Sequence, residues 1–175
     1  MKKTILGLIG VVILILVGSS IYEQLNKKGA KSKRLDCHKN VTVFERVYHQ
    51  DRLLSIKDLL NDGKFKLEFR VEKSKYMDTQ LFEYVDIEQT QDEILNIFNH
   101  KEDSNTLKVK VLLYENDKKD PGKKSKEALL YAGYLMFDFY LENSLVYKIQ
   151  IDFMDMQGHD IKQTIECIKN SIITI

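Results

Sequence analysis

The stretch KFKLEFRVE at residues 64–72 decides the fold class. Its apolar residues Phe65, Leu67, Phe69 and Val71 alternate with charged residues. This period of two is typical of a β-strand with one face on a core and the other in water. Such strands belong to antiparallel or mixed sheets that keep one solvated face. The sequence therefore predicts a sheet exposed on one side.

Residues 106–115 show the same alternation, and further apolar or β-rich runs predict strands at 40–47, 81–87, 128–141 and 145–153. Capping-box patterns predict helices near 55–61 and 90–98, with Gly63 ending the first. Isoleucines at helical spacing predict a last helix over 161–172. About six strands and three helices make an α+β fold, in which we expect an antiparallel sheet with the C-terminal helix packed on it.

Composition supports one folded domain and argues against nucleic-acid binding. The chain has 175 residues, 43% hydrophobic and 30% charged, with a net charge of +1. Seven basic residues and one acidic residue lie in residues 1–34, which leaves 20 basic and 25 acidic residues, a net charge of −5, in the remainder. Nucleic-acid affinity comes mainly from basic side chains that neutralise phosphates, so this acidic domain fits that function poorly.

Residues 1–22 predict a signal-anchor or a signal peptide. Residues 4–22 carry no charge and follow Lys2 and Lys3. As a helix, such a segment nearly matches a hydrocarbon core of about 30 Å. The alternative is a cleaved signal peptide, with a cut after Ser20. A lipoprotein signal is rejected because Ser19 stands where the lipidated cysteine must be.

Residues 23–34 predict a basic linker, and residues 35–175 the folded domain. The five basic residues after the span favour an internal domain, whereas the short basic tail before it is typical of exported proteins. We expect an extracytoplasmic, periplasmic domain anchored by one pass in the inner membrane. The alternative is secretion to the periplasm after signal cleavage.

No catalytic, cofactor or metal site is predicted. The sequence GKKS at 122–125 lacks the upstream glycine of a phosphate-binding loop. The four histidines lack zinc-ligand spacing. Asp152, Asp155, His159 and Asp160 form the densest polar group, for which capping of the last helix is favoured over a cation site.

The two cysteines predict a disulfide. Cys37 is next to His38, which suggests an activated thiolate, but sequence neighbours seldom have catalytic geometry. Cys167 lies about 120° from the centre of the isoleucine stripe, on a flank that another segment can reach. A Cys37–Cys167 bond is therefore the preferred interpretation for an oxidising location.

Aromatic residues of the last hairpin suggest a partner surface. Phe137 and Phe139 share one strand parity, which we assign to the core, and the opposite parity carries Tyr134, Met136 and Tyr140. These three face either a covering helix or a partner, and they are the candidate partner surface because tyrosines bring contact area at little entropy cost. The leading hypothesis is a protein-binding module, either an accessory subunit of an envelope complex or an inhibitor or immunity protein. The alternatives are a small-ligand or lipid-binding domain, which needs a deep apolar pocket, and an unrecognised enzyme, which needs titratable groups in a cleft.

Overall fold

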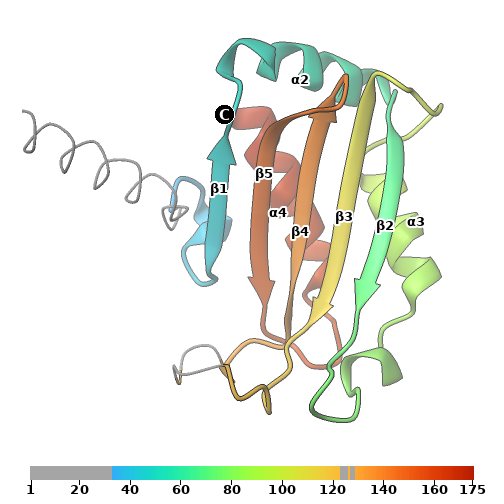
Figure 1. Ribbon diagram of the computed structural model, residues 1–175. Coiled ribbons are helices and arrows are strands. Elements are labelled where there is room, and N and C mark those ends of the chain that lie inside the picture. The colour runs from blue at the N-terminus through green and yellow to red at the C-terminus, as the bar shows by residue number, and fades with distance from the viewer. Residues whose placement is uncertain (1–32, 123–125, 127–128) are drawn as a thin grey trace, which may run out of the picture. The chain divides into compact units, whose positions relative to one another are not determined.

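The computed structural model describes residues 33–122, 126 and 129–175. A five-stranded sheet forms the framework (Figure 1), in the order β1-β5-β4-β3-β2. Its strands are β1 (Val43–Val47), β2 (Lys66–Glu72), β3 (Leu107–Glu115), β4 (Gly133–Leu141) and β5 (Ser144–Phe153). Strand β2 confirms the strand predicted from the alternating stretch, and β4 with β5 confirms the predicted hairpin.

The sheet is mixed, so the prediction of a purely antiparallel sheet was wrong. Strands β1, β5, β4 and β3 pair antiparallel, but β2 pairs parallel to β3. Strand β2 is parallel to β3 because the strand predicted between them, at 81–87, is absent, and the short 3-10 helix η3 (Leu81–Glu83) takes its place. The chain instead crosses over through one helix, which returns it in the same direction.

Within the described residues, three α-helices accompany the sheet: α2 (Leu53–Asp62), α3 (Ile87–Ile97) and α4 (Ile161–Thr174). Helices α3 and α4 run along one face of the sheet, while α2 crosses one end of it (Figure 1). The C-terminal helix packs on β4 and β5, as predicted. Gly63 ends α2 with φ of 74°, the left-handed conformation that glycine adopts readily.

The start of α3 differs from the predicted capping box. Asp86 is the N-cap, and its carboxylate accepts a 3.0 Å hydrogen bond from the Gln89 amide. Thr90, which was expected to open the helix, is one turn inside it, where its hydroxyl donates to the Asp86 carbonyl oxygen. The helix therefore begins about one turn earlier than the sequence pattern indicated.

The core lies between the sheet and the helices, and aromatic rings fill its centre. The ring centroids of Phe98 and Phe137 are 5.8 Å apart, and those of Phe139 and Tyr147 are also 5.8 Å apart. All four side chains are buried. The predicted core parity of β4, with Phe137 and Phe139 inward, is therefore confirmed.

Among the described residues, no helix has the length and apolar character needed to cross a bilayer. The span predicted at residues 4–22 lies outside those residues.

Candidate interaction face

The sheet face opposite the helices is the most extensive candidate site, and we call it the open face. It consists of alternate side chains from all five strands, and in the described part of the chain no helix lies over it (Figure 1). The strand register arranges them in four rows across the sheet. We name these rows acidic (Glu72, Tyr114, Tyr134, Asp152), apolar (Arg70, Leu112, Met136, Gln150, Phe44), mixed (Glu68, Lys110, Asp138, Lys148, Arg46) and basic (Lys66, Lys108, Tyr140).

The centre of the open face is a hollow lined by both apolar and charged side chains, where Leu112 is buried and Met136 is half-buried. Leu112 and Met136 are paired across β3 and β4, and a hollow of about 240 Å³ lies over them. Charged side chains surround this hollow, including Arg70, Lys110 and Asp138. Apolar contact area enclosed by polar groups is the usual anatomy of a protein-binding surface.

Ion pairs hold the charged side chains of the mixed row in place. The Glu68 carboxylate lies 3.4 Å from Lys108 Nζ and 3.7 Å from Lys110 Nζ. Asp138 lies 3.2 Å from Lys148 Nζ. Burial raises the pKa of Asp138, although the neighbouring Lys148 ammonium partly opposes that effect. The row is thus an ordered set of charges across the middle of the sheet.

The acidic row contains a pair of stacked tyrosines. The Tyr114 and Tyr134 rings lie 4.5 Å apart between centroids, at an interplanar angle of 18°. Burial, with the neighbouring Tyr114, raises the pKa of Tyr134 to about 12, so this phenol stays neutral at physiological pH. Glu72 at the edge of the sheet is the accessible acid of this row, because Asp152 is buried.

All three residues of the predicted partner surface lie on the open face. Tyr134, Met136 and Tyr140 occupy three different rows of β4, and each side chain is half-buried. Their role as a partner surface stays a prediction. Sequence reasoning missed Leu112, although Leu112 is apolar at a position where the alternation of Lys108 and Lys110 predicts a polar residue.

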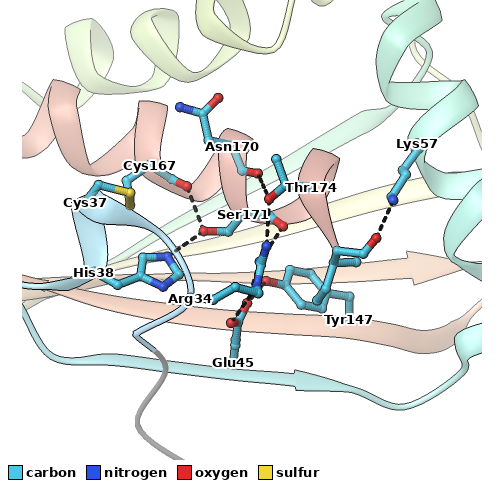
Figure 2. Close-up of polar contacts among 11 residues, drawn as sticks. Arg34, Cys37, His38, Glu45, Lys57, Tyr147, Cys167, Asn170, Ser171 and Thr174 are labelled. Atoms are coloured by element: carbon cyan, nitrogen blue, oxygen red, sulfur yellow. Dashed lines mark hydrogen bonds and ion pairs between the residues drawn. A yellow bond between two sulfur atoms is a disulfide. The ribbon is translucent and has the colours of Figure 1, made fainter.

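The predicted disulfide is present and joins the start of the domain to its last helix (Figure 2). Cys37 and Cys167 are bonded, with Cα atoms 6.0 Å apart. His38 is fully buried beside them and its Nε2 lies 2.8 Å from Ser171 Oγ. Because Ser171 Oγ donates to the Cys167 carbonyl oxygen, it accepts from the imidazole. Burial lowers the pKa of His38, which favours the neutral ring.

Arg34 adds a second attachment at the same place. Its guanidinium contacts Glu45 through both carboxylate oxygens, at 3.2 and 3.1 Å, and also donates to the Ser171 carbonyl and the Thr174 hydroxyl (Figure 2). Glu45 also accepts a 2.7 Å hydrogen bond from the Tyr147 hydroxyl. Burial, reinforced by Glu45, raises the pKa of Tyr147. Arg34, predicted as the end of the linker, therefore belongs to the packed domain.

The cysteines and His38 also form a group whose potential metal-ligating atoms lie within 4.8 Å of one another. Both sulfur atoms are engaged in the disulfide, so in this state they are not thiolate ligands. The arrangement accounts structurally for the Cys37–His38 dipeptide, whose members bind α4 rather than each other.

The acidic group before α4 organises a loop. Asp160 stands at the N-cap but makes no side-chain cap bond; instead its carboxylate accepts from the Met154 and Asp155 amides, at 2.7 and 3.2 Å. Asp155 accepts from the Gln157 amide and lies 2.9 Å from His159 Nδ1. The expected capping of the helix by these side chains was therefore wrong in detail, since they satisfy loop amides.

Other hollows in the described residues are polar and open to solvent, or small. One of about 290 Å³ lies where α3 and α4 begin, lined by polar side chains such as Gln89, Glu93 and Lys162. A hollow of about 50 Å³ near Phe98 and Ile172 is more enclosed. A third, of about 350 Å³, is an open surface hollow lined by Asp62, Lys64, Lys101 and Glu102. Ligand pockets for drug-sized molecules bury most of the ligand, which open or small hollows do not.

The comparisons with known proteins do not assign the chain to a family. No protein-family model matches the chain, and no curated protein matches it. A PelC dodecamer from Paraburkholderia phytofirmans is a distant structural match, with 8% sequence identity and a TM-score of 0.39. That alignment covers 75% of this chain and 96% of the PelC chain. A similarity at this level carries no functional argument.

Proposed function

We propose that residues 35–175 form an extracytoplasmic protein-binding module that engages its partner through the open face. The observation that carries this proposal is the combination of apolar, aromatic and charged side chains on one uncovered sheet face. Half-buried Met136 supplies apolar area, half-buried Tyr134 and Tyr140 supply aromatic area, and ordered ion pairs lie between them. Tyrosine and methionine are both enriched at protein interfaces.

The disulfide supports the extracytoplasmic part of the proposal. Disulfides persist in oxidising compartments and are rare where thiol reductants are active. The apolar segment at residues 4–22, preceded by two lysines, supplies a route out of the cytoplasm as an anchor or a cleaved signal. On this proposal the module is an accessory subunit of an envelope complex, or an inhibitor or immunity protein.

The open face supports this function better than it supports catalysis or ligand binding. Its titratable groups pair with one another across strands, as Glu68 does with Lys108, and its hollow is shallow. An enzyme needs groups that converge on a reacting atom, and a lipid-binding domain needs a deep apolar cavity. A broad surface of paired charges around an apolar centre suits contact with another protein surface.

Site-specific photo-crosslinking in intact cells tests the proposal. The photoreactive residue p-benzoylphenylalanine replaces Met136 on the open face or, as the matched control, Glu166 on the exposed side of α4. We expect discrete protein adducts from position 136 and none from position 166. Equal adducts from both positions, or no adduct from position 136, would contradict the assignment of the open face.

A further inference from the structure

We propose that the occupant of the open face is a second copy of this chain, bound face to face about a two-fold axis. This inference rests on the proposed function and names its partner. The argument comes from the distribution of charge over the four rows, since an isologous interface requires one surface to complement itself.

The open face has opposite charge at its two ends. Glu72 is the accessible acid at the acidic end, because Asp152 is buried, and Lys66 is the exposed lysine at the basic end, because Lys108 pairs with Glu68. The two rows are separated along the strands by the apolar and mixed rows. Between residues 66 and 72 a strand extends about 20 Å, so the two ends are too far apart to neutralise each other.

A two-fold axis that runs parallel to the sheet above its open face, perpendicular to the strands and level with the boundary between the apolar and mixed rows, makes the ends complementary. It places the acidic row of one copy over the basic row of the other. On β2 it pairs Glu72 with the second copy's Lys66, and Arg70 with its Glu68. Two packed sheets cross at about 30°, a rotation that these long side chains can accommodate.

The same axis brings together favourable ring contacts. The Tyr114 ring meets Lys108, and Tyr134 meets Tyr140, on β3 and β4 of the two copies. A similar contact already exists within one chain, where Lys110 Nζ lies 4.9 Å from the Tyr140 ring centroid. Cation–π and aromatic pairs each add to association beyond the area they bury.

The size of the open face predicts a weak dimer. Five strands about 4.8 Å apart, with about seven residues of 3.3 Å each, span roughly 550 Å² per copy. Twice this area, roughly 1,100 Å², is near the lower limit for specific interfaces. We therefore expect self-association at concentrations of about 1–100 µM rather than a permanent dimer.

Charge reversal at the two ends of β2 tests the geometry. The full-length chain, isolated in a mild detergent as its expression host processes it, is followed by sedimentation velocity up to about 200 µM. Lys66→Glu and Glu72→Lys each replace two attractive contacts per dimer with two repulsive ones, so each weakens dimerisation by about 30-fold. Lys162→Glu and Glu166→Lys, on the exposed side of α4, are the matched controls and leave it unchanged.

Restoration by complementary charges is the decisive measurement. Because Glu72 of one copy meets Lys66 of the other, the double variant dimerises like wild type, and an equimolar mixture of the two single variants forms heterodimers. A wild-type chain that stays monomeric overturns the inference, as do single reversals that neither the double variant nor the mixture restores. Open-face adducts to a protein of different mass, together with a monomeric wild type, would reject the second copy while leaving the proposed function standing.

Discussion

Replacing Glu115 with glutamine removes the charge around which the loop after β2 is folded. Glu115 ends β3 and is fully buried. Its Oε1 accepts from the Gln80 and Leu81 amides, at 2.7 and 2.9 Å. Its Oε2 accepts from the Ser74 amide and hydroxyl, each at 3.1 Å, and from the Thr79 hydroxyl at 2.8 Å. One carboxylate therefore satisfies three backbone amides of the loop.

The expected loss of stability in Glu115→Gln arises because a glutamine amide has one acceptor oxygen where the carboxylate has two. Its carbonyl oxygen still accepts from Gln80 and Leu81, and the Thr79 hydroxyl can turn to accept. The Ser74 backbone N–H can only donate, so it faces the new amide N–H without an acceptor. A buried unsatisfied donor costs about 1–3 kcal/mol, and hydrogen bonds to a charged group are worth about 1.5–3 kcal/mol each. We expect the free energy of unfolding to fall by about 3 kcal/mol at pH 7.

The same substitution has a defined pH dependence. Burial alone disfavours the Glu115 carboxylate, but hydrogen bonds from Leu81, Gln80, Ser74 and Thr79 outweigh it and lower its pKa below the ordinary 4.5. The stabilisation from ionisation is therefore fully present above about pH 4.5 and is lost as the pH falls through the lower, folded-state pKa. The difference between wild type and Glu115→Gln is constant above that pH and shrinks below it.

Urea unfolding of both proteins, followed by circular dichroism at pH 7 and at acidic pH, measures these differences. Glu102→Gln is the control, because the Glu102 side chain is 63% exposed and its removal costs less than about 0.5 kcal/mol. A loss below about 1 kcal/mol for Glu115→Gln, or a loss that does not shrink in acid, would refute the reasoning.

Three further outcomes are expected. The Cys167→Ser variant loses the gel-mobility shift seen without reductant, and its unfolding free energy falls by at most about 5 kcal/mol, the chain-entropy value for a closed loop of 130 residues. Equal stability of variant and wild type would contradict this prediction. In urea unfolding, Phe69→Ala on the core side of edge strand β2 lowers the unfolding free energy by about 2 kcal/mol, whereas Arg70→Ala on the open face lowers it by less than about 0.5 kcal/mol. Equal losses would contradict the assignment of the two faces of β2. Protease added to cells with a permeabilised outer layer removes residues 35–175. Protection of the domain in spheroplasts would overturn the orientation, and a soluble product whose mass corresponds to a chain starting near Ile21 would establish signal cleavage.

Hydrophobic alternation was sufficient to predict much of the sheet. It located β2 and β3, and it assigned Phe137 and Phe139 to the core. The cysteine pair was predictable for a different reason, because only two thiols are present and Cys167 lies on the flank of a helix. In these cases the deciding signal is local in the sequence.

The mixed topology was not predictable because its cause is a contact between distant residues. The sequence LFEYV at residues 81–85 has the composition of a strand. In the structure the Leu81 amide bonds to Glu115, 34 positions later, and the segment forms a 3-10 turn with Leu81 buried. Sequence periodicity carries no information about this partner, so the predicted strand, and with it the antiparallel topology, failed together.

The described N-terminus of the domain is attached to the last helix. Arg34 bonds to the Ser171 carbonyl and the Thr174 hydroxyl on α4, and Cys37 bonds to Cys167 on the same helix. Because α4 covers the opposite face of the sheet, the chain enters the described domain from the helix side of β1. The disulfide, the Arg34 contacts and the hydrogen bond from buried His38 to Ser171 together hold this entry point in place. Reduction of the disulfide alone therefore leaves two constraints, Arg34 and His38, that keep the segment on the helix side.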